Sequence, residues 1–410
     1  MSTESETAQT PRAGENLLEA MGLPIFFDAG HASALGLGLP ENRHGQTVRV
    51  WARSLTVMQK EAIVVSARSG RAWRVTSDEG PYLDGFDFAP CPLSLLTTGM
   101  VSSYMNEILA LARHERVEIR ELTLIQDNRY TMEGSALQGT MTGGALPVEL
   151  AVHVSADADE ASLARLLRDA VAASPLHGLL RPRHRSLFTL TLNDKEIPVG
   201  RVGAIGEPAP PDPAGLFERL TPAGGTTEPL VERVQAIDIV HGIVGGAGSS
   251  LQATQKRQLH LRGTCRLRED GVKEVTQELF SPRGSTFRFL SDETAEFDGR
   301  GRAPDSVAYA AAGIAFCFMT QLGRYAKILK RNLERYNLIQ DIHFSLGGAS
   351  AATGRPGVAD AVETHVYLAS SEDEAFARQT VDMGEQTCFL HALCRTEVNT
   401  HVTVNPPPTP

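Results

Sequence analysis

The stretch APDSVAYAAAGIAFCFMTQLGRYAKILKR, residues 303–331, decides the fold. It is entered at Pro304, is small and apolar over most of its length, and ends in basic residues. Proline is favoured in the first turn of a helix, and cations are favoured at its carboxyl end, where the helix dipole is negative. The sequence therefore predicts a long buried helix with Cys317 in its middle.

This stretch belongs to a segment that has a counterpart in the first half of the chain. WRVTSDE at 73–79 aligns with FRFLSDE at 287–293, an offset of 287 − 73 = 214 residues. LIQD at 124–127 aligns with LIQD at 338–341 at the same offset. Because this register is kept without a gap over about a hundred residues, it indicates a duplicated unit.

The two copies differ at two positions that matter chemically. At the 214-residue offset, Cys317 falls on Ser103 and Cys388 falls on Ser174. Serine has a similar size but lacks the sulfur atom that can be ionised and oxidised. The sequence therefore predicts one copy that retains a pair of thiols and one copy that has lost it.

The order of the elements predicts an α+β fold. In each copy, alternating apolar and polar residues indicate a strand meander, followed by a long helix, further strands and a second helix. We expect the two long helices to pack against each other, so that the copies form a pseudo-symmetric pair within one chain. The predicted division is an N-terminal extension, a first repeat, a linker rich in Pro and Gly, a second repeat and a tail: 1–45, 46–199, 200–256, 257–404 and 405–410.

Composition limits the class of partner. The chain has 410 residues, of which 42% are hydrophobic, and a net charge of −10, which argues against nucleic acid or a membrane surface as a partner. Its N-terminus has no apolar signal region, and no apolar run is expected to span a bilayer. Five cysteines without framework spacing predict free thiols in the cytoplasm.

We expect neither a cofactor nor a metal. The glycine-rich stretch GIVGGAGSS at 242–250 lacks the lysine of a phosphate-binding loop. His391, three residues after Cys388, could form a Cys/His metal site, but His177 has the same place in the serine copy. That repetition favours a structural hydrogen bond. The three remaining cysteines are interpreted as packing residues: Cys91, Cys265 and Cys394.

Two segments of the second copy resemble the OsmC/Ohr family (osmotically inducible and organic hydroperoxide resistance proteins). They are SDETAEFDGRGRAPDSVAYAAAGIAFCF at 291–318 and EQTCFLHAL at 385–393, and SDEGPYLDGFDFAPCPLSLLTTGMVSSYM at 77–105 has the same frame without the cysteine. The resemblance implies that each copy has the swapped α+β fold of the family, in which two subunits normally pair. Here the pair would be fused, with further homo-oligomers left open.

The resemblance also implies site residues and a reaction. Cys317 would react with a peroxide and Cys388 would resolve the product as a disulfide, while Arg283 and Glu296 fall near the catalytic arginine and glutamate of the family. Two departures from the family pattern are Phe316, before the first cysteine, and the residue after the second cysteine, Phe389. Two further arginines are candidate cations for the thiolate: Arg288 and Arg324.

The sequence leaves three functions open. The first is reduction of organic hydroperoxides through the thiol pair in oxidative stress defence, with a dithiol such as a lipoyl group as reductant. The second is binding or sensing of a hydrophobic small molecule. The third is transfer or hydrolysis of a thiol-linked metabolite at Cys317. Activity that survives removal of both cysteines would indicate binding, and activity that needs only Cys317 would indicate transfer.

Overall fold

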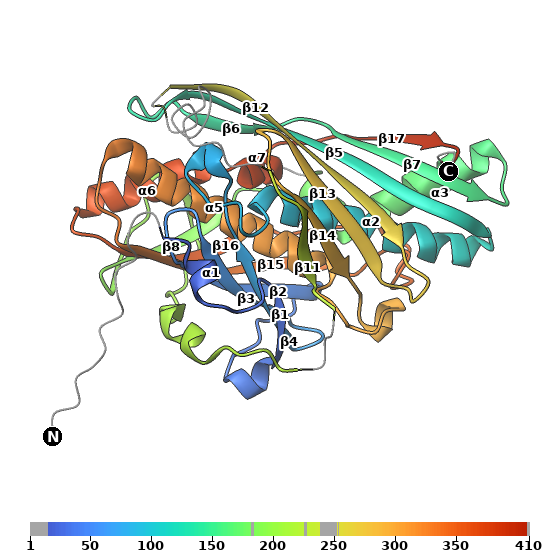
Figure 1. The fold of residues 1–410 in the computed structure, drawn as a ribbon, viewed down its shortest axis with the longest axis horizontal. Helices are drawn as coiled ribbons and strands as arrows, with labels where there is room; N and C mark the ends of the chain where they lie inside the picture. The colour runs from blue at the N-terminus through green and yellow to red at the C-terminus, as the bar shows by residue number, and fades with distance from the viewer. Residues whose placement is uncertain (1–14, 182–183, 225–227, 238–251, 253, 408–410) are drawn as a thin grey trace.

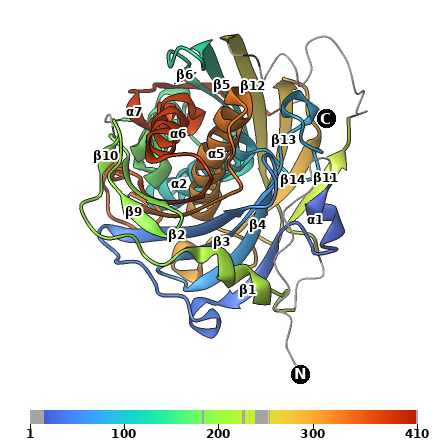
Figure 2. The same ribbon diagram turned by 90° about the vertical axis from the view of Figure 1, so that its left-hand side faces the viewer.

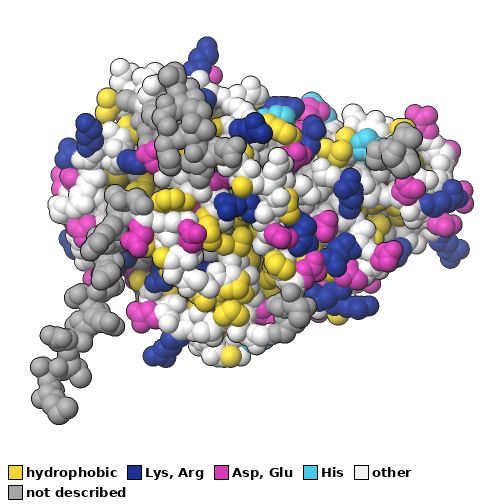
Figure 3. All heavy atoms as spheres, in the orientation of Figure 1, with side chains coloured by type: hydrophobic (Ala, Val, Ile, Leu, Met, Phe, Trp, Pro, Cys, Tyr) yellow, Lys and Arg dark blue, Asp and Glu magenta, His cyan; other side chains and the backbone are white. Residues whose placement is uncertain are grey.

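Two β-sheets enclose two long helices in this computed structural model, which describes residues 15–181, 184–224, 228–237, 252 and 254–407 (Figure 1). The predicted α+β class is therefore confirmed. Viewed end-on, the helices lie between the sheets (Figure 2). On the face seen in Figure 3, basic and acidic side chains are interspersed and form no large region of one sign.

Each sheet has an uninterrupted strand path. In order across it, the first sheet contains β1 (Phe27–His31), β4 (Arg71–Ser77), β3 (Lys60–Ser66), β2 (Gly45–Ser54), β15 (Arg335–Ser345), β16 (Glu363–Ala369), β8 (Leu187–Leu192) and β10 (Gly203–Ala204), with β9 (Lys195–Ile197) beside β8. The second sheet contains β11 (Val231–Gln235), β14 (Thr286–Ser291), β13 (Lys273–Ser281), β12 (Thr254–Leu267), β5 (Ile119–Ser135), β7 (Val148–Ala156) and β17 (Thr400–Asn405), with β6 (Thr142–Ala145) beside β5.

The helices keep the 214-residue register seen in the sequence. The long helices α2 (Pro92–Glu115) and α5 (Ser306–Leu329) each have 24 residues and begin 306 − 92 = 214 positions apart. The outer helices α3 (Glu160–Ala173) and α6 (Glu374–Thr387) are related by the same offset. Shorter helices are α1 (Leu17–Ala20) and α7 (Phe389–Arg395), and 3-10 turns lie at 32–35, 81–83, 175–179, 213–219 and 295–297.

Both sheets are built from both halves of the chain. In the first sheet β2 pairs with β15, and in the second sheet β12 pairs with β5. Equivalent ion pairs cross these two seams: Arg49 Nη2 lies 2.6 Å from Asp341 Oδ2, and Arg262 Nη2 lies 2.8 Å from Asp127 Oδ2. The meander of one half therefore completes its sheet with the later strands of the other half.

The segments outside the predicted repeats also contribute strands. β1, in the N-terminal extension, pairs with β4, and β11, in the predicted linker, pairs with β14. Residues 1–14 of the extension and the glycine-rich stretch at 242–250 lie outside the described residues. The structure does not test the predicted domain boundaries themselves, which stay a prediction.

Two glycines allow the long helices to cross closely. A Cβ added to Gly99 of α2 would lie 2.4 Å from the carbonyl oxygen of Ser306, and one added to Gly313 of α5 would lie 2.8 Å from the carbonyl oxygen of Pro92. Both distances are shorter than van der Waals contact permits, so the crossing requires glycine at both positions. The two glycines are 214 residues apart, so each helix contributes the glycine at the equivalent position of its copy.

The length of α5 corrects one expectation from the sequence. By length and hydropathy, this helix could cross a membrane, whereas we expected no such run. Its whole apolar window is buried inside the protein between α2, α6 and the first sheet. Burial in the core therefore accounts for its apolar character.

Candidate functional site

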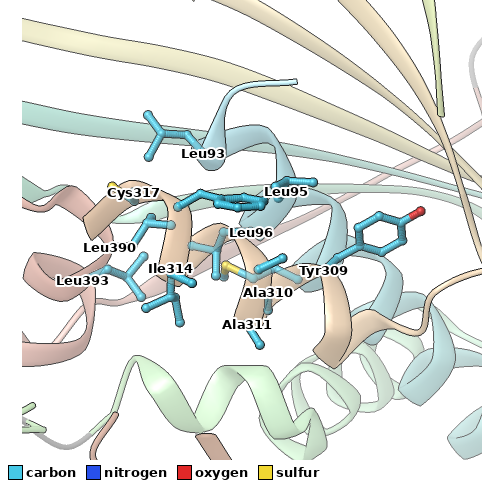
Figure 4. Packing of buried hydrophobic residues seen from close by; sticks show 14 of the residues in the cluster. Leu93, Leu95, Leu96, Tyr309, Ala310, Ala311, Ile314, Cys317, Leu390 and Leu393 are labelled. Carbon is cyan, nitrogen blue, oxygen red and sulfur yellow. The ribbon is translucent and has the colours of Figure 1, made fainter. Parts of the chain in front are cut away.

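The fold brings the two predicted thiols together. Cys317 lies on α5 and Cys388 lies between α6 and α7, and the thiol of Cys388 is near enough to Cys317 to raise its pKa. Both sulfur atoms are buried: Cys317 is 2% exposed and Cys388 is 0% exposed. Figure 4 shows Cys317 beside Leu390 and Leu393 of α7 in the apolar core. All five cysteines are unpaired thiols in this structure.

Cys388 is positioned by the joint between two helices. It is the C-cap of α6 and the N-cap of α7, in extended backbone conformation, so its sulfur faces the first N–H groups of α7. The backbone N–H of His391 donates to the Cys388 sulfur at 3.5 Å, and the Nδ1 atom of His391 lies 3.2 Å from it. Burial lowers the pKa of His391 to about 4, so the imidazole is neutral at physiological pH.

Cys317 lies in surroundings that keep it protonated. Burial raises the pKa of the Cys317 thiol well above its usual value, and the hydrogen bond to Cys388 raises it further. The nearby carboxylate of Glu79 acts in the same direction, and the backbone N–H of Leu390 opposes these effects. Cys317 is therefore a neutral thiol in this conformation.

A buried chain of polar groups lies next to Cys317. Thr320, one turn later on α5, donates to Glu79 Oε1 at 3.0 Å and accepts a hydrogen bond of 2.7 Å from Lys60. The hydroxyl of Tyr82 donates to Glu79 Oε2 at 2.7 Å. Burial lowers the pKa of Lys60, although the neighbouring carboxylates and the Cys317 thiol partly offset this. Lys60 and Glu79, which are linked through the Thr320 hydroxyl, bring two opposite charges close together in the core.

Arg324 is the only one of the candidate arginines that lies beside this chain of groups. It is 1% exposed, two turns after Cys317 on the same helix, and donates to Gln321 Oε1 at 3.1 Å. Burial and the neighbouring Arg257 lower the pKa of Arg324 to about 9, while Glu79 raises it. Arg288, in contrast, pairs with Glu228 and Glu232 at the surface. The cysteine site is defined as Lys60, Glu79, Cys317, Thr320, Arg324, Cys388 and His391.

The serine copy forms an equivalent site with the halves exchanged. Ser103 Oγ and Ser174 Oγ lie 2.8 Å apart, where the cysteine site has its two sulfur atoms. Lys273 donates to Asn106 at 2.5 Å, and Asn106 donates to Glu293 at 2.6 Å, which repeats the arrangement of Lys60, Thr320 and Glu79. The serine site is defined as Ser103, Asn106, Glu107, Ser174, His177, Lys273, Glu293 and Asp305.

Two residues predicted from the resemblance do not meet the thiols. Arg283 is exposed in the turn between β13 and β14. Glu296 has 61% of its side chain exposed and pairs with Arg68 at the surface. The physical reason is the exchange of strands, because the loop that precedes α5 borders the serine site. Glu79, from the loop that precedes α2, lies beside Cys317 instead.

Three functional candidates escaped the sequence analysis. Lys60 and Glu79 belong to the serine copy, which looked silent, and no pattern in that copy alone links them to Cys317. Cys91 was interpreted as a packing residue, yet its sulfur interacts electrostatically with Lys60 and Glu79. Lys60, Glu79 and Cys91 align with Lys273, Glu293 and Asp305 of the second copy. That alignment, together with an exchange of strands between the two copies, could have identified them.

The reactive side chains of the cysteine site can be compared with those of a metal site in the part of the chain that the structure describes. Within it, no three His, Cys, Asp or Glu side chains converge in a way that could hold a metal ion. His391 contacts Cys388, stacks on Phe188 and packs at a tilt against Phe318. A pair of buried thiols, a neutral imidazole and a buried Lys–Thr–Glu chain are the groups available for reaction.

Comparison with known proteins agrees with the resemblance for the second copy. Residues 299–403 match the family model of the OsmC-like proteins, and both cysteines of the site lie in this segment. A crystal structure of an OsmC-like hydroperoxide resistance protein from Jannaschia sp. CCS1 is 20% identical, covers 32% of this chain and 79% of that chain, and has a TM-score of 0.19. None of the curated proteins matches. Residues 299–403 thus form an OsmC-like segment.

Proposed function

We propose that this chain is a thiol-dependent hydroperoxide reductase of the OsmC/Ohr type, acting in the cytoplasm. The observation that carries the proposal is the contact between Cys317 and Cys388, because two thiols in contact can form a disulfide with little movement. The match of residues 299–403 to OsmC-like proteins supports the same chemistry. The substrate class is an organic hydroperoxide.

The reaction uses both thiols and no resident cofactor. One thiolate attacks the outer peroxide oxygen, the O–O bond breaks, and the alkoxide takes up a proton and leaves as an alcohol. The sulfenic acid that forms is attacked by the second thiol, giving a disulfide and water. An external dithiol, such as a lipoyl group, reduces the disulfide by exchange and is itself oxidised to a disulfide.

Access to the buried sulfur atoms requires a local opening. The β5–β6 hairpin covers Cys388: a Cβ on Gly143 would lie 2.6 Å from the carbonyl oxygen of Thr387. Gln386 donates to the carbonyl oxygens of Gly139 and Met141 at 3.0 and 2.8 Å and holds the hairpin down. We place the substrate entry beneath this hairpin, so Gln386→Ala is expected to speed the reaction of both thiols with a small alkylating reagent.

We also propose that the chain is a fused pair of OsmC-like units. The support is the strand order: β4-β3-β2-β15-β16 in one sheet and β14-β13-β12-β5-β7 in the other, which are the same pattern with the halves exchanged. Only one of the two equivalent sites would then be active, because the other has serines. Each chain would then contain one active site.

Intact-protein mass spectrometry with thiol alkylation tests the reaction. After one equivalent of an organic hydroperoxide, we expect two of the five thiols to become unreactive and peptide mapping to join Cys317 to Cys388. Cys265→Ser is the matched control, since Cys265 is equally buried but lies on β12 outside the site. Five alkylated thiols and an unchanged mass after peroxide treatment would reject a peroxide as substrate. Turnover that persists in Cys388→Ser but not in Cys317→Ser would favour transfer of a thiol-linked metabolite.

A second candidate, binding of a hydrophobic small molecule, is favoured by a separate observation. A cavity of about 420 Å³ lies between the end of α2, the end of α3 and the loop at 348–356, a size within the range of ligand pockets. Its apolar lining includes Leu111, Ala172, Ala173, Ala349, Ala352 and Pro356. Fluorescence of an apolar dye would report binding, and Ala172→Trp, which fills the cavity, should abolish the signal.

A further inference from the structure

One arginine side chain connects three elements around Cys388. Arg395 is the last residue of α7, and its guanidinium folds back to the carboxyl end of α6. There Nη1 donates to the carbonyl oxygen of Glu385 and Nη2 donates to that of Gln386, both at 2.8 Å. Nη2 also donates to the carbonyl oxygen of Gly143 on β6 at 3.0 Å. A single group therefore holds the end of α6, α7 and β6 together.

The surroundings of Arg395 suit a guanidinium that keeps one position. The last carbonyl groups of a helix have no partner within the helix and lie at the negative end of its dipole, so a cation that binds them is favoured. The carboxylate of Glu385 accepts a further hydrogen bond from Nη1 at 3.0 Å and balances the positive charge. Because the planar guanidinium donates to several fixed acceptors at once, its geometry is well defined.

The joint that these bonds restrain is the segment that presents the second thiol. Cys388 is both the C-cap of α6 and the N-cap of α7. β6 lies directly on this joint, since a Cβ on Gly143 would lie 2.6 Å from the carbonyl oxygen of Thr387. A rotation of α7 relative to α6 would move the Cys388 sulfur away from Cys317, and the hydrogen bonds of Arg395 oppose that rotation.

We propose that Arg395 is a positioning residue that keeps Cys388 within reach of Cys317 while the disulfide forms. This inference rests on the proposed hydroperoxide reductase function, with Cys317 as the attacking thiol and Cys388 as the resolving thiol. Cys317 takes one oxygen atom from the hydroperoxide and becomes a sulfenic acid, and the rest of the hydroperoxide leaves as an alcohol. Cys388 then attacks that sulfur, its proton leaves with the hydroxyl group as water, and the S–S bond forms.

Arg395 acts on the second of these steps. Its hydrogen bonds reach the joint that carries Cys388, not α5, which carries Cys317. The attack of Cys317 on the hydroperoxide is therefore not expected to slow when Arg395 is removed. The attack of Cys388 on the sulfenic acid depends on the position of the joint, and a small displacement of a reacting group costs a large factor in rate.

The serine copy contains an equivalent arginine at a joint without a thiol. Arg181, which lies 395 − 181 = 214 positions before Arg395, donates to the carbonyl oxygen of Ala172 at 3.0 Å. This bond is the counterpart of the bond from Arg395 to Gln386. The serine copy has a valine where the cysteine copy has Glu385, so the carboxylate bond has no counterpart. Arg181 therefore provides a matched control.

Rapid mixing of the full-length chain with one equivalent of an organic hydroperoxide separates the two steps. Peroxide consumption reports the attack by Cys317. Quenching with dimedone at timed intervals, followed by mass spectrometry, reports the conversion of the sulfenic acid to the disulfide. In Arg395→Ala we expect the disulfide step to slow by about tenfold while peroxide consumption is not slowed. An unchanged disulfide step, or an equal loss in both steps, would overturn the positioning role.

Two more variants distinguish positioning from a loss of stability. Arg395→Lys keeps the cation but lacks the planar fork that reaches α6 and β6 together, so it should slow the disulfide step by about threefold. Arg181→Ala should leave both steps unchanged, and the same slowing there would contradict a specific role of Arg395. If Arg395→Ala does not fold, Arg395→Lys decides, and a disulfide step as fast as in the wild type rejects the inference.

Oxidation by diamide tests the positioning role without a hydroperoxide. Diamide takes two electrons and two protons from a pair of thiols, so the rate at which it joins Cys317 to Cys388 depends on how well the two sulfur atoms are aligned. We expect this rate to be about tenfold lower in Arg395→Ala than in the wild type. If that difference is found but the wild type does not react with hydroperoxide, the hydroperoxide function fails and the positioning role stands. Equal rates with diamide would overturn the positioning role.

Discussion

The cysteine site and the serine site have equivalent places in the fold but differ in the ionisable groups that each adds. Beside the shared Lys–Glu pair, the cysteine site adds the cation Arg324, where the serine site has Ala110. The serine site adds two buried carboxyl groups, Glu107 and Asp305, where the cysteine site has uncharged side chains. The comparison teaches that the loss of sulfur is one part of a wider change that makes the serine site unfavourable for an anion.

The same comparison explains how such a difference can arise. Two identical subunits related by a two-fold axis present two identical sites. When the equivalent segments lie in one chain, each residue is specified separately, so one site can retain a pair of thiols while the other gains carboxyl groups. The geometry of Lys60–Thr320–Glu79 and Lys273–Asn106–Glu293 stays alike, which shows that the scaffold tolerates both chemistries.

Moving the thiols from one site to the other should have the largest effect. The double variant Cys317→Ser/Cys388→Ser is expected to lose hydroperoxide turnover by more than about a hundredfold. Adding Ser103→Cys and Ser174→Cys should not restore it, because His177 faces Tyr104 and the added carboxyl groups disfavour a thiolate. Peroxide consumption measures the outcome, and alkylation verifies that the new thiols are free. Restored turnover would mean that sulfur alone distinguishes the sites.

The pH dependence of stability should differ between the helix caps Asp305 and Cys91. Burial, followed by the charge of Glu293, raises the pKa of Asp305 from 3.8 to about 7. The folded state thus keeps a proton that the unfolded state releases near pH 4, so this contribution is complete below about pH 4 and is lost as the pH rises through 7. Asp305→Asn, which preserves the cap, should abolish a fall on the order of 3 kcal/mol.

Urea unfolding at pH 4, 5.5 and 7.5 measures this effect, with Cys91→Ser as the control at the equivalent cap. Cys91 should show no comparable dependence, since burial raises the pKa of its thiol to about 12. Identical pH curves for the wild type and Asp305→Asn would mean that Asp305 is ionised in the folded protein at low pH.

Glu107 and Gln321 offer the next comparison, in stability alone. Glu107 accepts hydrogen bonds from the backbone N–H groups of Ala349 and Ser350, at 2.8 and 3.1 Å, and from the Ser350 hydroxyl at 2.5 Å. Glu107→Ala leaves those donors unpaired and should cost about 2 kcal/mol. Gln321→Ala, which affects one hydrogen bond to Arg324, should cost less than ~1 kcal/mol. Equal losses in denaturant unfolding would show that the loop at 347–350 does not depend on Glu107.

The smallest effect is expected at the two surface residues suggested by the family resemblance. Arg283→Gln and Glu296→Gln should change turnover by less than about twofold and stability by less than ~1 kcal/mol, because both side chains are exposed and the Glu296–Arg68 pair is at the surface. Steady-state kinetics with an organic hydroperoxide checks this. A drop of tenfold or more in either variant would show that these residues approach the thiols during the reaction.

The sequence was sufficient for the parts of the fold that depend on local pattern. The helix around Cys317, the α+β class and the 214-residue register could be read from periodicity and repetition, since each depends on residues close together in the chain. The contact between Cys317 and Cys388 also followed, from the resemblance. Arg283 and Glu296 were chosen because they fall near the catalytic arginine and glutamate in the family resemblance, and the structure places both side chains at the surface.

The remaining site residues depend on strand exchange, which no local pattern specifies. Glu79 and Lys60 reach Cys317 only because β2 pairs with β15 and the loop before α2 borders α5. The contact of His391 with sulfur depends on Phe318 replacing a tyrosine in a neighbouring helix, which is a property of packing rather than of spacing. Pairings between residues that are far apart in the chain were therefore where prediction failed.

The seam between β2 and β15 has a consequence for how the chain folds during synthesis. Arg49 and Asp341, which pair across it, are separated by 292 positions. At roughly 5–20 residues per second, a ribosome needs on the order of 15–60 s to make that much chain. For that time β2 has no partner on one side, and an unpaired strand edge invites association with other chains. Nascent molecules are therefore expected to depend on chaperones until the last third of the polypeptide emerges, and refolding should be slow.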